Sequence, residues 1–130
     1  MPITITKPWG KEVILTTDNL PYTAKILSIK TGHRFSLQSH DQKIETLTLI
    51  KGQAQITLGQ NQDSLSSQKM KLQTGYTIQP HTLHRIKAIT DCQIFEASTP
   101  EKGTTKRFED DYNRSDETEK IRNSTNRGWQ

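Results

Sequence analysis

Short runs of apolar and β-branched residues, separated by polar stretches, recur through the first part of the chain. The clearest runs are residues 22–30, 44–50, 54–58 and 93–97. Their loose alternation and their content of Ile, Thr, Leu and Phe are typical of strands. No apolar stripe of helical period occurs before Thr99. Several short strands at a spacing of about ten residues predict an all-β sandwich or barrel.

Glycine and proline punctuate these runs where turns are expected in an all-β layout. The positions are Gly32, Gly52, Gly59, Gly75 and Pro80. Residues 59–69 are polar and lack periodicity. We therefore expect them to form a long loop between the two halves of a barrel.

The end of the chain differs in character from the rest. Residues 1–114 are predicted to form one barrel domain, and residues 115–130 a short polar tail. For the tail we expect either a frayed helix around residues 116–122 or disorder. Trp129 is unusual in such a segment. We expect an untethered end there, with docking onto the body or onto a neighbouring subunit as the alternative.

Composition limits the chain to one domain and narrows its partners. A length of 130 residues suits a single core, and the low hydrophobic content of 30% is concentrated before Glu101. Residues 101–130 hold equal numbers of basic and acidic residues, so the formal charge of +4 lies in the first 100 residues. This bias suits an anionic small molecule. Basic runs and an aromatic stacking set are missing, which argues against nucleic acid.

The single cysteine and the first residues indicate the compartment. Cys92 has no partner for an internal disulfide and is expected to pack as a small apolar residue. The chain begins without a charged segment followed by an apolar run of signal-peptide length, and no stretch approaches a membrane span. The expected location is the cytoplasm, without membrane association.

All four histidines lie in two windows, residues 32–45 and 79–85, which points to a metal site. Gln38 and His40 are two residues apart and so share one face of a strand. Glu45 follows after a turn, and His84 comes from a later strand. Imidazole nitrogen combined with carboxylate and amide oxygen suits one divalent ion of Mn, Fe, Co, Ni or Zn. Such a set leaves coordination positions open for water or substrate.

The two histidine windows resemble the two cupin motifs. The first motif is matched by Gly32, Gln38, His40, Glu45 and Gly52, with glutamine where many cupins have their first histidine. The second is shortened and runs from Gly75 to the ligand position, His84. His33 and His81 then fall on loop or rim positions, although contact with substrate is an alternative for each.

Four further segments narrow the resemblance. Residues 7–12, 36–40, 94–100 and 107–114 look like the small cupins related to the C-terminal domain of type II mannose-6-phosphate isomerases. The resemblance implies a double-stranded β-helix (jelly-roll) barrel, one bound divalent metal, and a homodimer. It also implies a small-molecule sugar phosphate as ligand.

In an isomerase of this type, the sugar would present its C1 and C2 oxygens to the metal, which stabilises charge on an enediolate while a base moves a proton. Glu96, within an apolar strand, and Lys43 are the catalytic candidates, although an ion pair is the alternative role for Glu96. For the phosphate we expect Arg34, Arg85 and Arg107. Arg85 directly follows a ligand and should point away from it on a strand, which favours a surface or intersubunit contact instead.

Two other functions remain open. A metal-containing cupin could bind a sugar without turning it over, and nothing in the sequence excludes this. A nucleotide-sugar ketoisomerase or epimerase is the other alternative. The set of four predicted ligands argues against it, because such cupins usually work through a histidine and an acid or tyrosine without metal.

Overall fold

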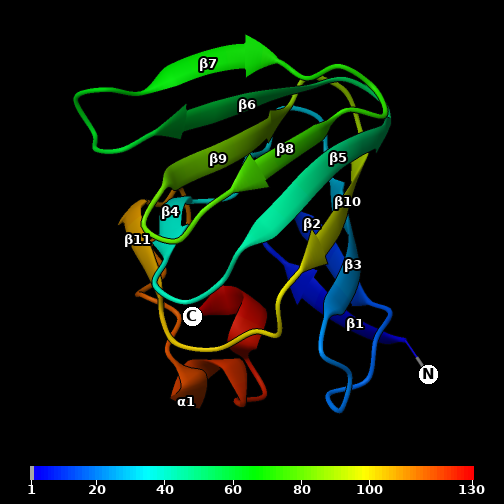
Figure 1. Cartoon of the computed structure of the whole chain (residues 1–130), viewed down its shortest axis with the longest axis vertical. Helices are drawn as coiled ribbons and strands as arrows, with labels where there is room; N and C mark the ends of the chain where they lie inside the picture. The colour runs from blue at the N-terminus through cyan, green and yellow to red at the C-terminus, as the bar shows by residue number, and fades with distance from the viewer. Residues whose placement is uncertain (1) are drawn as a thin grey trace.

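A computed structural model describes residues 2–130 (Figure 1). Within this range the chain forms eleven strands, one short α-helix and one 3-10 turn. Their bounds are β1 (Ile3–Lys7), β2 (Gly10–Ile14), β3 (Thr23–Ile29), β4 (Leu37–His40), β5 (Glu45–Lys51), β6 (Ala54–Gly59), β7 (Ser66–Lys69), β8 (Gly75–Ile78), β9 (Leu83–Ala88), β10 (Cys92–Ser98), β11 (Thr105–Glu109), α1 (Glu119–Arg122) and η1 (Arg127–Trp129).

The strands form two antiparallel sheets. One has the order β1-β2-β3-β10-β5-β8, and the other has the order β11-β4-β9-β6-β7. The apolar runs predicted as strands correspond to β3, β5, β6 and β10. The all-β architecture predicted from periodicity is therefore confirmed. Among the described residues, no helix is long and apolar enough to cross a membrane.

The core lies between the two sheets and follows from the alternation of side chains along each strand. In β10 every second residue from Cys92 to Ser98 is buried. The main buried apolar residues are Leu27, Ile29, Leu47, Leu49, Ile56, Ile78, Ile86 and Ile94. Cys92 belongs to the same core, as expected, and burial raises the pKa of its thiol to about 11.

The turn between β5 and β6 depends on glycine. Gly52 has a φ of 84°, in the left-handed region that glycine adopts readily. A Cβ there would also lie 2.2 Å from the carbonyl oxygen of Asp91. Glycine is therefore required twice at this position, for its backbone conformation and for its lack of volume.

The expected long loop at residues 59–69 is only partly a loop. Its second half is strand β7, which pairs with β6 from Gln55 to Leu58. All four residues of β7 are exposed. A solvated edge strand held by backbone hydrogen bonds has no apolar side to mark it, which is why periodicity missed it.

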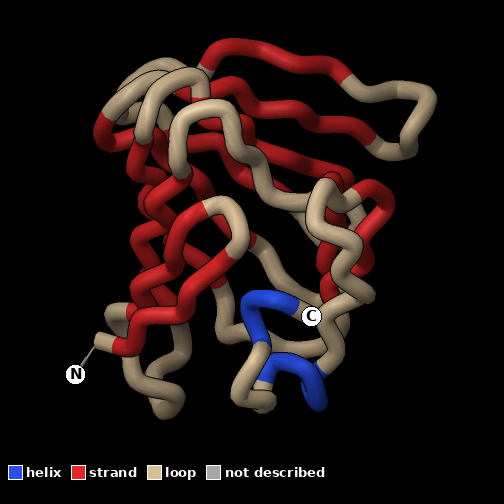
Figure 2. The backbone as a smooth tube through the Cα atoms, turned by 180° about the vertical axis from the view of Figure 1, so that it is seen from behind, coloured by secondary structure: helices blue, strands red, loops and turns tan. Residues whose placement is uncertain are grey.

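The tail beyond residue 114 packs against one end of the barrel, where both helical segments lie (Figure 2). Its helix α1 is capped by Thr118, whose side chain accepts a hydrogen bond from the amide of Ile121. Backbone bridges join Glu117 to Thr105 on β11. In η1, Arg127 and Gly128 are buried, whereas Trp129 remains 59% exposed. The tail is thus tied to the barrel just before Trp129.

Candidate metal centre and its cavity

Three of the four predicted ligands meet inside the barrel. His40 ends β4, Glu45 begins β5, and His84 lies on β9, and all three side chains are buried. Each sits on the inward face of its strand, as the alternation along these strands requires. One ligand atom from each residue can be chosen so that all three lie within 4.8 Å of one another.

The nitrogens and oxygens of this group face one another. His40 Nε2 lies 2.9 Å from Glu45 Oε2, and His84 Nε2 lies 3.8 Å from Glu45 Oε1. His40 Nε2, Glu45 Oε2 and His84 Nε2 are all buried without a hydrogen-bond partner of adequate geometry. Unsatisfied buried polar atoms are costly, so three at one point indicate a group that completes them.

The remaining ring nitrogens hold the two imidazoles in orientation. His84 Nδ1 lies 3.1 Å from the carbonyl oxygen of Thr82, which can only accept, so this nitrogen carries the proton. His40 Nδ1 is hydrogen-bonded to Thr105 Oγ1 at 2.8 Å. Each ring therefore turns Nε2 toward Glu45. Such outer contacts are the usual way in which proteins orient metal-binding histidines.

The charge states suit a metal. Burial lowers the pKa of His84 to about 4, so its imidazole is neutral near pH 7. Burial raises the pKa of Glu45, but the nearby Lys43 ammonium outweighs this effect and holds the pKa well below its usual range. Neutral imidazole and ionised carboxylate are the forms that bind metal. Two nitrogens and one carboxylate fit a borderline divalent ion such as Zn, Mn, Fe, Co or Ni.

Gln38 borders the same cavity but is less free than the other three. It lies on β4 opposite His84 on β9. Its Oε1 accepts a hydrogen bond from Ser36 Oγ at 2.6 Å. To serve as a fourth ligand, this oxygen would use its second lone pair. Its role as a ligand stays a prediction.

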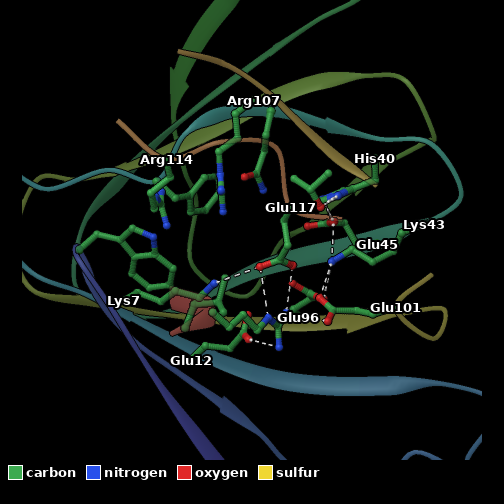
Figure 3. A pocket seen from close by; sticks show the side chains of 16 residues that line it. Lys7, Glu12, His40, Lys43, Glu45, Glu96, Glu101, Arg107, Arg114 and Glu117 are labelled. Carbon is green, nitrogen blue, oxygen red and sulfur yellow. Dashed lines mark hydrogen bonds and ion pairs between the residues drawn. The ribbon is translucent and has the colours of Figure 1, made fainter. Parts of the chain in front are cut away.

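The donor group opens into a cavity of about 50 Å³ that is crowded with charge (Figure 3). Small-molecule sites usually measure roughly 300–1,000 Å³. The cavity has room for an ion and water, but not for a sugar phosphate in this conformation. Its charged lining residues are Lys7, Glu12, Lys43, Glu45, Glu96, Glu101, Arg107, Arg114, Glu117 and Arg127.

The two predicted catalytic residues lie beside the predicted metal ligands. Lys43, in the loop between β4 and β5, places its Nζ 3.2 Å from Glu96 Oε2 and 3.4 Å from Glu45 Oε2. Burial lowers the pKa of Lys43, but Glu45 and its other acidic neighbours reverse this and raise it well above its usual value. Glu96 faces inward from β10 and also accepts a hydrogen bond from Ser98 Oγ at 2.9 Å. The ion pair weighed as an alternative for Glu96 is therefore present.

Two of the three arginines predicted to bind phosphate lie outside this cavity. Arg34 forms a forked ion pair with Asp111 on the surface, at 2.7 and 2.8 Å. Arg85 follows His84 on β9 and points the opposite way, where its Nε donates to the carbonyl oxygen of Phe35 and its Nη1 to Glu109. Both side chains thus link segments that are far apart in the sequence: Arg34 binds Asp111, and Arg85 binds Phe35 and Glu109. Only Arg107 reaches the cavity.

Several charged residues in and around the cavity were not predicted from the sequence. Arg127 comes from the tail and lies 2.8 Å from Glu101 and 3.2 Å from Glu117. Lys25, on β3, bonds Glu12 at 3.2 Å and also pairs with Glu101. Charged residues in a tail or a strand usually face solvent, so their burial has no local signal. Arg114, in contrast, lies within the segment 107–114 that carried the family resemblance.

Known proteins agree with this architecture. The sequence matches the family model described as mannose-6-phosphate isomerase C-terminal over residues 1–115. No curated protein sequence matches the chain significantly.

Solved structures show the same fold. CapF from Staphylococcus aureus, described as a capsular polysaccharide assembling protein, superposes with a TM-score of 0.69 at 14% identity, over 91% of this chain and 34% of that one. KdgF from Halomonas sp. gives 0.64 at 14% identity, over 75% and 86%. Oxalate decarboxylase from Bacillus subtilis gives 0.64 at 16% identity, over 76% and 27%. The chain thus spans only about a third of the CapF chain.

Identities this low show the fold alone, and that fold is the cupin barrel. The family match is broader evidence, because it covers most of the chain. The chain therefore belongs to the mannose-6-phosphate isomerase C-terminal family and has the cupin fold that its motifs predicted.

Proposed function

We propose that this protein is a metal-dependent sugar-phosphate isomerase that interconverts the aldose and ketose forms of a phosphorylated hexose. The observation that carries the proposal is the buried Lys43–Glu96 pair, which lines the same cavity as His40 and Glu45, with His84 Nε2 behind them at 3.8 Å from Glu45 Oε1. An aldose–ketose exchange needs a proton-transfer group and a centre of positive charge near each other. The match to the mannose-6-phosphate isomerase C-terminal family supports the same proposal.

Each residue has a part that follows from its position. His40, Glu45 and His84 would hold the metal, with Gln38 as a fourth candidate. A bound divalent ion supplies positive charge that stabilises a developing sugar oxyanion. Among the described residues, both hydrogen bonds to Glu96 are accepted by its Oε2. Its Oε1 is therefore left to take the proton from one sugar carbon and return it to the next.

Lys43 fixes the position of this base. Its ammonium lies between Glu96 and Glu45, at 3.2 and 3.4 Å. It therefore connects the proton-transfer group to the metal ligand. Glu101 Oε1, at 3.5 Å, completes the acidic surroundings of Lys43.

A second function has its own support. A cupin that binds metal and sugar without turnover would also need the ligand residues, and the small cavity together with the ion-paired state of Glu96 favours it. In such a protein, Lys43 and Glu96 would stabilise the barrel only. The two functions differ in whether Glu96 is needed for more than folding.

A coupled assay for conversion of mannose 6-phosphate to fructose 6-phosphate tests the proposal. The full chain is stripped and reloaded with Mn, Fe, Co, Ni or Zn, beside His84→Ala, Glu96→Gln and the surface control Lys51→Gln. We expect turnover that needs metal and His84, and that falls about 10²–10⁴-fold in Glu96→Gln. The Lys51→Gln control should match the unmodified chain.

The outcome separates the two functions. Turnover that survives in Glu96→Gln would remove this residue from the mechanism. A stoichiometric metal without turnover of any hexose phosphate would refute the isomerase and favour the binding module.

A further inference from the structure

Arg107 differs from the other cations that line the cavity. Lys7, Lys43, Arg114 and Arg127 each have a carboxylate oxygen within 4.0 Å. In residues 2–130, Arg107 has none. Its Nη1 donates instead to two backbone carbonyl oxygens, those of Ser115 and, at 2.9 Å, Gln130. Its Nε is buried without a hydrogen-bond partner. A guanidinium amid five side-chain carboxylates thus has only backbone oxygens as partners.

Arg114 enters the same cavity (Figure 3). Its Nε and Nη2 are bound to Asp110 at 2.9 Å each. Its Nη1 makes only a long contact, 3.4 Å, with the carbonyl oxygen of Gly128. Burial and the nearby Arg114 charge lower the pKa of Arg107. The two guanidinium groups line one cavity, and each has an N–H donor that is unpaired or only weakly paired. This arrangement favours an anion between them.

Apart from the carbonyl oxygen of Ser115, the backbone oxygens that now accept from these donors belong to residues 127–130, which we call the cap. The cap is fastened by Arg127, which lies 3.2 Å from Glu117, 2.8 Å from Glu101 and 3.6 Å from Glu12. At Gly128 the fit is very close, because a Cβ would lie 1.9 Å from the carbonyl oxygen of Thr6 on β1. With the cap in place, the cavity is too small for a sugar phosphate.

We propose that Arg107 and Arg114 bind the phosphate monoester of the ligand, and that the ligand displaces the cap when it binds. Without ligand, the backbone oxygens of Gly128 and Gln130 occupy the places of phosphate oxygens. A phosphate brings negative charge to the guanidinium and can accept two parallel hydrogen bonds from it, which a single backbone oxygen cannot do. An arriving phosphate therefore competes successfully for these donors. Displacement of the cap also opens the cavity toward the metal ligands.

The identity of the sugar in this inference rests on the proposed function. The binding of a phosphate group at Arg107 and Arg114 does not. Inorganic phosphate is therefore the probe, titrated calorimetrically into the full chain with and without chelator. The chelated sample reports binding that needs no metal. The variants are Arg107→Gln, Arg107→Lys and Gly128→Ala, and the matched control is Lys106→Gln, the neighbour of Arg107 on β11.

We expect Arg107→Gln to weaken phosphate binding about tenfold or more, and Arg107→Lys to weaken it less, because a point charge remains without the fork. Lys106→Gln should change the dissociation constant less than about twofold. Gly128→Ala should increase the affinity for phosphate severalfold, because the added methyl group would collide with Thr6 and displace the competing cap. Circular dichroism of each variant identifies any that fails to fold.

Limited proteolysis provides a second readout. Phosphate should increase tryptic cleavage after Arg127 in the unmodified chain, because the cap dissociates from the barrel and becomes accessible to the protease. Gly128→Ala should show this cleavage without phosphate. Phosphate binding that is unchanged in both Arg107 variants would overturn the inference, as would a Gly128→Ala protein with unaltered affinity and cleavage.

The two proposals can fail separately. Phosphate bound at Arg107 by a protein without isomerase activity would leave the anion site standing and remove the isomerase. Isomerase activity that persists unchanged in Arg107→Gln would support the isomerase and refute the anion site at Arg107.

Discussion

Thr105 has a larger part in the candidate site than its small side chain suggests. Its hydroxyl is hydrogen-bonded to His40 Nδ1 at 2.8 Å, in a buried environment. This contact holds the ring so that Nε2 points to Glu45. Sequence motifs identify ligands but not the residues that orient them, because the latter come from another strand.

Replacement of Thr105 tests that role. Thr105→Val keeps the shape of the side chain but removes the hydroxyl, so His40 loses its orienting partner. We expect metal affinity to fall about 10–100-fold, measured by competition with a chromophoric chelator. Thr104→Val, at the preceding position, is the control and should bind metal normally. Equal affinities of the two variants would show that the contact does not orient the ligand.

Single residues also show where sequence reasoning succeeded and where it stopped. The positions of His40, Glu45 and His84 on inward strand faces could be predicted, because alternation places them there. The same alternation indicated that Arg85 points away from His84, as it does. Assigning the phosphate to Arg34 and Arg85 went beyond that rule. Which arginine enters a cavity depends on contacts between segments far apart in the sequence.

Among the elements, the turn between β5 and β6 gives a sharp test of backbone geometry. Gly52 and Gly32 both have positive φ, 84° and 78°. A Cβ at Gly52 would collide with Asp91 and Cys92, whereas a Cβ at Gly32 would have nothing within 4 Å. The two glycines therefore separate the cost of conformation from the cost of crowding.

We expect Gly32→Ala to lower the free energy of unfolding by about 1–2 kcal/mol, the cost of a left-handed residue with a Cβ. Gly52→Ala should cost about 1–3 kcal/mol more, because overpacking adds to it. Urea unfolding of both variants measures the difference. Equal losses would mean that the turn shifts freely to admit the methyl group.

Elements with an apolar face were predictable, and elements without one were not. Strands β3, β5, β6 and β10 carry buried residues at alternate positions and were found by periodicity. Strand β7 and the tail are polar, so their structure depends on partners that the local sequence does not reveal. For the tail, the partners are the acidic residues around Arg127, which come from three separate segments: Glu12, Glu101 and Glu117.

On the scale of the whole molecule, the closed end of the barrel depends on buried ion pairs. Burial raises the pKa of Glu117, but Lys7 and Arg127 outweigh it and lower the pKa to about 2. The ordinary value is 4.5. A carboxyl group whose pKa is lower in the folded state stabilises the fold above the unfolded pKa. That stability is lost as the pH falls from 4.5 toward 2.

The loss attributable to Glu117 should be of the order of 3 kcal/mol across this range. Urea unfolding at about pH 7 and about pH 2 measures it. Glu117→Gln should be less stable than the unmodified chain at neutral pH, and the gap should narrow in acid because the Gln side chain does not titrate. A gap that stays constant between the two pH values would assign the acid sensitivity to other groups.

The homodimer and the cytoplasmic location expected from the sequence remain predictions at this scale. Sedimentation velocity will test the first. The cap and the metal ligands, in contrast, lie within one chain and need no partner for their tests.

Thr105 also links the predicted metal ligands to the tail. Its hydroxyl contacts His40, while its backbone amide and carbonyl exchange hydrogen bonds with Glu117, both at 2.9 Å. One residue therefore contacts a predicted metal ligand and also anchors the tail. Coupling between two such sites is reciprocal. We therefore expect a metal bound at His40 to stabilise the tail, and a ligand that releases the tail to weaken metal binding by the same factor.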